Sequence, residues 1–116
     1  MAQRKVAGAK KQSANGQKYV DENILVSAGD YKLTMQVRFW QVRDESTMPV
    51  NITINGILAV NGIKVINGLN GLFIGMPSYK KKDGTWEEYV YPVSKEARIS
   101  MYEQILKLAD QHWEEL

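Results

Sequence analysis

The most concentrated basic site outside the first 18 residues is a run of three lysines between Tyr79 and Trp86. Its members are Lys80, Lys81 and Lys82. Ammonium groups can neutralise nucleic-acid phosphates, and an aromatic ring beside them can stack on a base. The Asp83-Gly84 pair that follows indicates a turn, so the lysines are expected in a loop. An edge hairpin whose lysines deter sheet-to-sheet aggregation has the same pattern, and the residues alone favour neither interpretation.

Two further cations lie at the start of the predicted helix. Ser94 is a good N-cap, and Glu96 follows in the first turn, where the helix dipole favours a carboxylate. Lys95 and Arg98 lie in the same turn, and Arg98 is placed to reach outward. From these residues alone, ordinary solvation of a helix surface is favoured over ligand contact for both cations.

The charge of the chain is distributed unevenly. The 116 residues carry a formal charge of +2, yet residues 1–18 contain five cations and no acid, so the remainder sums to −3. The cations of this first segment are Arg4, Lys5, Lys10, Lys11 and Lys18. Its few apolar side chains cannot offset the entropy of ordering, so we expect a flexible basic arm over residues 1–30 and a folded domain over residues 31–116. A weak apolar patch over residues 19–26 allows a short extra strand, but the polar run Asp21-Glu22-Asn23 interrupts it. Such an arm either neutralises nucleic-acid phosphates or acts as a solubilising leader without a partner.

Nothing in the sequence indicates catalysis. The absence of cysteine excludes thiol nucleophiles and Cys-ligated metals, and no GxxxxGK[ST] motif or metal-ligand cluster is present. The single histidine, His112, is expected to be a surface or satisfied residue rather than a catalyst. We therefore assign no catalytic residue, metal, cofactor or small-molecule substrate. Without an apolar run long enough to span a membrane or serve as a signal peptide, we expect a cytoplasmic protein.

The elements that must position these residues form an α+β pattern. Apolar and polar residues alternate over residues 31–40 and 50–54, which is typical of strands with one buried face. Three Asn-Gly pairs at 55, 61 and 67 mark turns or bulges, and a short strand follows at 72–76. Their spacing of six also fits a hexapeptide repeat, but the flanks are not repetitive. After residue 94, apolar residues at steps of three and four predict an amphipathic helix. We predict a curved antiparallel sheet with hairpins and one C-terminal helix.

The alternating strand 31–40 also presents a polar face that could bind a ligand. Lys32, Arg38 and Trp40 share this face. A charged strip beside an aromatic ring can hold a base or phosphate, although a solvated sheet face with one shielded ring is the commoner arrangement.

The central residues resemble a known family. Residues 63–78 read Ile-Lys-Val-Ile-Asn-Gly-Leu-Asn-Gly-Leu-Phe-Ile-Gly-Met-Pro-Ser, followed by the lysines, an Asp-Gly turn, Trp86 and Pro92. Residues 94–98 read Ser-Lys-Glu-Ala-Arg. These motifs resemble the stage V sporulation protein G (SpoVG) family of bacterial septation regulators, and the likeness covers about residues 31–110. Residues 1–30 have no counterpart in the family pattern.

The resemblance implies an antiparallel sheet with a C-terminal helix, assembled as a homodimer that is not an enzyme. It also implies binding to DNA, and in some members RNA, in the regulation of gene expression, septation and sporulation. The positions that match the expected contacts are Lys80, Lys81, Lys82, Lys95 and Arg98. The alternative is a protein–protein interaction module without nucleic acid, using a sheet edge or the helix aromatics Tyr102 and Trp113.

Overall fold

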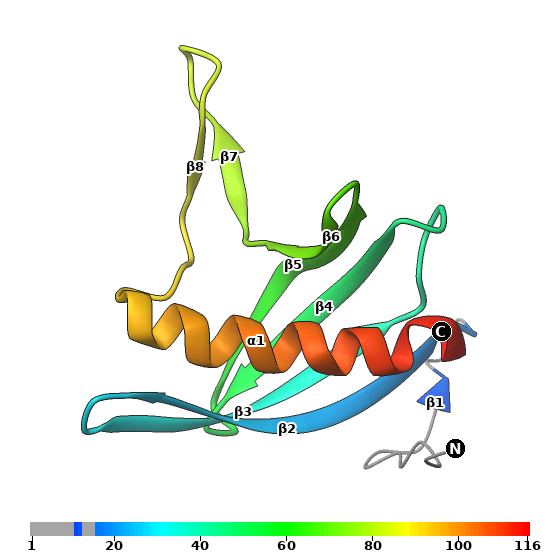
Figure 1. Ribbon diagram of the computed structural model, residues 1–116, viewed down its shortest axis with the longest axis horizontal. Helices are drawn as coiled ribbons and strands as arrows, with labels where there is room; N and C mark the ends of the chain where they lie inside the picture. Colours follow the sequence, from blue (N-terminus) through cyan, green and yellow to red (C-terminus); the bar gives the residue numbers. More distant parts are fainter. Residues whose placement is uncertain (1–10, 13–15) are drawn as a thin grey trace.

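The computed structural model describes residues 11–12 and 16–116 (Figure 1). The elements within these ranges are β1 (Lys11–Gln12), β2 (Lys18–Ala28), β3 (Tyr31–Trp40), β4 (Thr47–Ile54), β5 (Leu58–Gly68), β6 (Gly71–Gly75), β7 (Ser78–Lys80), β8 (Trp86–Glu88), α1 (Lys95–His112) and a 3-10 turn, η1 (Trp113–Glu115). Three of the proposed arm cations, Arg4, Lys5 and Lys10, lie outside the described residues.

Strands β1 to β6 form one antiparallel sheet in the order in which they follow along the chain. The longer strands β2 to β6 curl into half of a barrel, and α1 lies across its inner side (Figure 1). Strands β7 and β8 form a separate hairpin that projects away from this body (Figure 1). The predicted fold class, a curved antiparallel sheet with hairpins and one C-terminal helix, is confirmed.

The sheet begins earlier in the chain than we predicted. Residues 18–28, which the sequence pattern assigned to the arm, form β2 and pair with β3 from Tyr19 opposite Trp40 to Ala28 opposite Tyr31. The polar run at 21–23 does not interrupt the strand, because only Glu22 faces the helix and its carboxylate is paired there. Lys11 belongs to β1, opposite Tyr19. The boundary expected at residue 30 is therefore not the start of the sheet.

The hydrophobic core lies between the sheet and α1. Its side chains recur at every second residue in the strands and at every fourth residue in the helix. This spacing follows from the periods with which side chains return to one face of a strand and of a helix. They include Met35, Val37 and Phe39 of β3, Val50 and Ile52 of β4, Ile63 and Val65 of β5, and Met101, Ile105 and Ala109 of α1. The intervening strand residues face the opposite, outer side of the sheet, which α1 does not cover.

A buried polar contact joins β2 to the end of the helix. The imidazole Nε2 of His112 lies 2.6 Å from Oε2 of Glu22, and its Nδ1 lies 3.1 Å from Oε1 of Glu115. The side chain of His112 is completely buried, and Glu22 is only 6% exposed. His112 is thus a satisfied histidine that connects the two layers of the fold.

The three Asn-Gly pairs have three different roles. Asn55-Gly56 forms the β4–β5 turn, where both residues have positive φ, 52° and 71°. Asn61-Gly62 lies inside β5, where the pairing with β4 shifts register between Val50 and Ile52. Gly62 has a φ of 91°, which is the left-handed backbone that a bulge of this kind needs. Asn67-Gly68 ends β5 before the turn into β6.

Candidate nucleic-acid interface

The β7–β8 hairpin places the three lysines at the end of its projection. Lys80 is the last residue of β7 and pairs with Trp86, whereas Lys81 and Lys82 lie in the connecting turn. The amide of Lys81 donates to the carbonyl of Thr85 at 2.7 Å, which closes the turn. All three lysine residues are exposed. The expected loop around Asp83-Gly84 is therefore the tip of a short, ordered hairpin.

Asp83 fixes the geometry of this tip. Its Oδ1 accepts hydrogen bonds from the hydroxyl of Thr85 at 2.7 Å and from the Thr85 amide at 3.0 Å. These bonds, with the hydroxyl bond the larger cause, lower the pKa of Asp83 below its ordinary value of 3.8. The carboxylate is therefore directed back into its own turn.

Acids accompany the lysines on the hairpin. Lys81 Nζ lies 3.5 Å from Glu87 Oε1, and both side chains are about half exposed, at 43% and 53%. Such a pair contributes little to stability and can exchange for a phosphate contact. Within the described part of the chain, neither Lys80 nor Lys82 has a carboxylate in ion-pair range. These two ammonium groups are the free cations of the hairpin.

Aromatic rings and a further lysine lie at the foot of the hairpin. Tyr79 and Tyr89 pack with their ring centroids 6.0 Å apart, and Trp86 is 66% exposed. A hollow of about 360 Å³ separates the foot from the sheet; its lining includes Lys64, Gly62, Trp86 and Tyr89. Lys64 was not among the predicted contacts, although its position between the buried Ile63 and Val65 marks it as outward-facing.

The predicted cations at the helix start lie apart from the hairpin tip. Ser94 caps α1, its hydroxyl accepting from the amide of Ala97 at 3.1 Å, and Lys95 is exposed behind it. Arg98 donates to the hydroxyl of Tyr102 at 3.3 Å and lies 5.4 Å from the centre of that ring. Burial raises the pKa of Tyr102, and the nearby Arg98 opposes that rise. Figure 1 shows that β8 and the connection that follows it separate the hairpin tip from the helix start.

Metal-ligating side chains are not clustered in the described residues. Across 11–12 and 16–116, the structure has no group of three or more His, Cys, Asp or Glu side chains placed to hold a metal ion. The helix α1 is not long and apolar enough to cross a membrane, and no other helix in these ranges is.

A curled half-barrel sheet, one C-terminal helix and a projecting hairpin with lysines at its tip define a small α+β domain. The family model described as SpoVG matches residues 33–110, which is more than half of the chain. This chain belongs to the SpoVG family. The members of this family are regulatory proteins and are not known as enzymes.

Individual relatives agree with this assignment, and their names place them among the septation proteins called SpoVG. A protein of Symbiobacterium thermophilum is 39% identical over 61 residues, which are 53% of this chain and 44% of the relative. A protein of Anaeromyxobacter sp. strain Fw109-5 is 38% identical over 72 residues, which are 61% of this chain and 74% of the relative. A protein of Myxococcus xanthus is 35% identical over 77 residues, which are 66% of this chain and 78% of the relative. The chain thus spans less than half of the Symbiobacterium protein but about three quarters of the other two.

Proposed function

We propose that this protein binds nucleic acid, DNA or RNA, as a regulator of the septation and sporulation type, and that the β7–β8 hairpin makes the principal contact. The observation that carries the proposal is the exposure of Lys80 and Lys82 at the tip of a projecting hairpin, with Trp86 exposed beside them. Phosphate oxygens would replace water around the ammonium groups and release condensed counterions. The exposed ring would add stacking or shape contacts.

Further cations would extend the contact beyond the hairpin. Lys64 lines the hollow at its foot, and Lys95 and Arg98 lie where the chain enters α1. The arm residues Arg4, Lys5, Lys10 and Lys11 would add sequence-independent attraction. Since the chain after residue 18 is net acidic, affinity would depend on these local groups and not on the overall charge.

Binding should be strongly dependent on salt. With about six phosphate contacts, affinity for a labelled DNA or RNA is expected to fall roughly a thousandfold between about 50 and 200 mM salt. Fluorescence anisotropy of the full chain measures this fall. As a comparison, Arg4, Lys5 and Lys10 are changed together to Gln. If this arm variant alone abolishes binding, the hairpin is not the principal contact, and a salt-insensitive curve refutes the electrostatic account.

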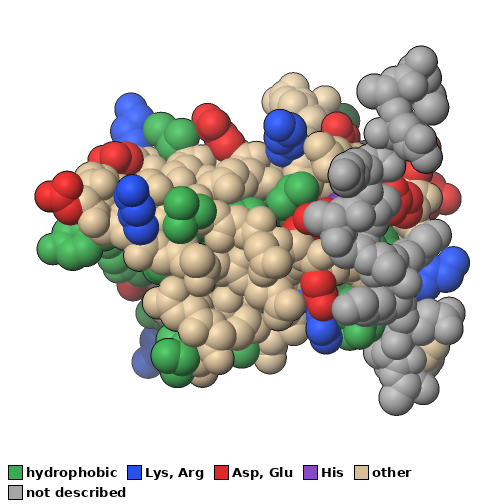
Figure 2. All heavy atoms as spheres, turned by 90° about the horizontal axis from the view of Figure 1, so that it is seen from below, with side chains coloured by type: hydrophobic (Ala, Val, Ile, Leu, Met, Phe, Trp, Pro, Cys, Tyr) green, Lys and Arg blue, Asp and Glu red, His purple; other side chains and the backbone are tan. Residues whose placement is uncertain are grey.

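We also propose that the protein is a homodimer, as the family resemblance implies, and that the second copy covers the end of the molecule at the β2–β3 turn. Figure 2 shows exposed hydrophobic side chains at its left end, where this turn lies in Figure 1. Tyr31, Ile57 and Val93 are 83%, 88% and 91% exposed. A hollow of about 810 Å³, lined mainly by apolar atoms, joins Tyr31 and Val93. Exposed apolar surface that is contiguous in this way marks interaction sites.

Light scattering tests the dimer. The full chain at micromolar concentration is expected to have twice the monomer mass. Changing Tyr31 and Ile57 together to Ser should shift the mass toward the monomer, because both changes remove apolar area from the proposed contact. The same substitution at Phe73 on β6, which is 50% exposed, is a matched control and should leave the mass unchanged. A monomeric wild type would refute the proposal. A monomer that binds only an unrelated protein through this end would favour the alternative, a protein–protein interaction module.

A further inference from the structure

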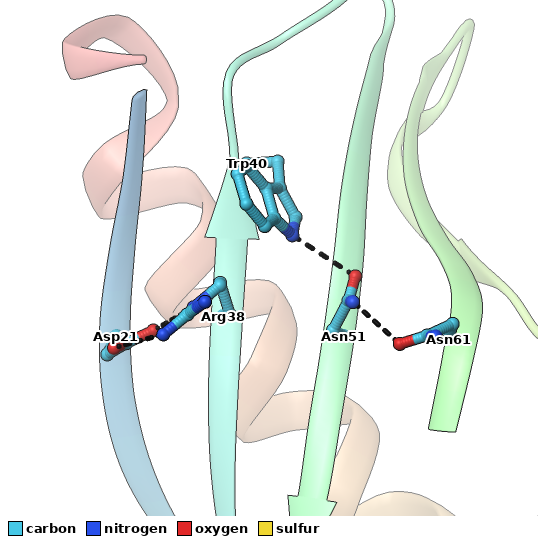
Figure 3. Close-up of polar contacts among 5 residues, drawn as sticks. All are labelled: Asp21, Arg38, Trp40, Asn51 and Asn61. Carbon is cyan, nitrogen blue, oxygen red and sulfur yellow. Dashed lines mark hydrogen bonds and ion pairs between the residues drawn. The ribbon is translucent and has the colours of Figure 1, made fainter. Parts of the chain in front are cut away.

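A group of packed aromatic and guanidinium side chains lies on the outer face of the sheet, opposite α1. Tyr19 of β2 and Trp40 of β3 are register partners, and their ring centroids are 5.0 Å apart with the ring planes tilted by 49°. The guanidinium of Arg38 lies 4.0 Å from the Tyr19 ring centre and 5.7 Å from that of Trp40. Asp21 holds this guanidinium with two hydrogen bonds of 2.7 and 3.1 Å (Figure 3). These contacts hold the planar groups in fixed positions on the outer sheet face, where they are partly exposed.

A row of hydrogen-bonded amide groups continues from this group of side chains across β4 to β5. The indole Nε1 of Trp40 donates to Oδ1 of Asn51 at 3.1 Å, and Nδ2 of Asn51 donates to Oδ1 of Asn61 at 2.6 Å (Figure 3). Because an indole N–H can only donate, the orientation of each amide is determined in turn. The NH₂ group of Asn61 is left at the outer end of the row, on an exposed residue.

Two hollows follow the same line. One of about 150 Å³ is lined by side chains that include Gln36, Arg38, Asn51 and Asn61. The next is the hollow at the hairpin foot, which begins at Gly62, directly after Asn61, and contains Lys64 and Trp86. A continuous row of side chains therefore runs from the Tyr19–Trp40 ring pair through the amides to Lys64 and the lysine hairpin. We call this row the outer strip.

The charges of the outer strip are complementary to a polyanion. At the start of the strip Asp21 is paired with Arg38, and this bidentate pair raises the pKa of Arg38. On the hairpin, Glu87 is paired with Lys81. Lys64 and then the hairpin lysines are cations at the other end of the strip. A neutral oligosaccharide could also use rings and amides but would gain nothing from these lysines.

We propose that the outer strip binds single-stranded nucleic acid. The inference rests on the proposed function and adds which form of the ligand the sheet can accept. Bases in a duplex are stacked inside it, so only a single strand can place them against planar side chains and amide groups on a flat sheet face. One base would lie against the Tyr19–Trp40 ring pair, the next would meet the NH₂ of Asn61, and the backbone would continue past Lys64 to the hairpin.

The test compares a labelled single strand of about 12 nucleotides, a length that one small domain can cover, with the duplex of the same sequence. Changing Trp40 to Ala is expected to weaken single-strand binding about five- to 150-fold and to leave duplex binding within about twofold. Asn61→Ala, at an exposed side chain, should weaken it about two- to tenfold without affecting the fold. Phe73→Ala removes an exposed ring outside both hollows and serves as the matched control.

The outcomes separate this inference from the proposed function. In one outcome, the duplex binds and the hairpin lysine substitutions weaken duplex binding, but neither Trp40→Ala nor Asn61→Ala changes single-strand affinity. The outer strip is then not the site, and only this inference fails. If neither form binds, both proposals fail. A response of tryptophan fluorescence to a neutral oligosaccharide, with none to the single strand, would also overturn the inference.

Discussion

Replacing His112 with alanine is expected to lower the free energy of unfolding by about 3–5 kcal/mol. The imidazole is completely buried and contacts Glu22 at 2.6 Å and Glu115 at 3.1 Å. Without it, Glu22 keeps a carboxylate that is 6% exposed and has lost its partner on α1. A domain of this size is stable by about 5–15 kcal/mol in total, so the change would remove a large part of that stability.

Urea unfolding of the single and double variants tests this account. Adding Glu22→Leu to His112→Ala should recover part of the lost stability, because removing both partners of a buried pair is often close to neutral. Loss of packing against Phe39, whose ring lies 6.2 Å away, would remain in both variants. The account would be contradicted if His112→Ala lowers the free energy of unfolding by less than about 1 kcal/mol. It would also be contradicted if the double variant is no more stable than His112→Ala.

The largest effect on binding is expected from neutralising the hairpin. Changing Lys80, Lys81 and Lys82 together to Gln should weaken nucleic-acid binding on the order of a hundredfold at about 0.15 M salt, since three of about six phosphate contacts are lost. The fold should remain intact, because these side chains are exposed and the turn is closed by backbone bonds and by Asp83. Fluorescence anisotropy measures the affinity, and thermal unfolding checks the fold.

A charge-matched variant distinguishes a local site from a general effect of charge. Lys32, Arg43 and Lys107 are exposed and lie outside the hairpin. Changing these three to Gln alters the net charge by the same amount. If both triple variants lose affinity equally, overall charge governs binding; if only the control loses it, the site lies elsewhere on the body.

Local patterns were sufficient for the elements whose signals are contained in a few residues. The alternation over 31–40 predicted β3, Ser94 predicted the start of α1, and Asp83-Gly84 predicted the hairpin tip. The bulge at Asn61-Gly62 was also among the expected roles of the Asn-Gly pairs. Each of these features depends on a short-range backbone or capping requirement, so neighbouring residues determine it.

Features that depend on distant partners could not be predicted in this way. Glu22 appeared to break a strand because its partner, His112, is 90 positions away in the sequence. The outer strip requires the register that brings Tyr19, Trp40, Asn51 and Asn61 into one row, and no local pattern determines it. Similarly, the two predicted cationic groups seemed close in sequence, yet the projecting hairpin separates residues 80–82 from the helix start.

The most direct test of the account is the salt dependence of binding, measured in parallel for the wild type and for the variant with Lys80, Lys81 and Lys82 changed to Gln. The slope of log affinity against log salt counts the phosphate contacts and is independent of absolute affinity. With duplex DNA as the ligand, we predict a wild-type slope of about −5 and a slope shallower by about 2.7 in the variant. Equal slopes for the two proteins would contradict the assignment of the nucleic-acid contact to the β7–β8 hairpin.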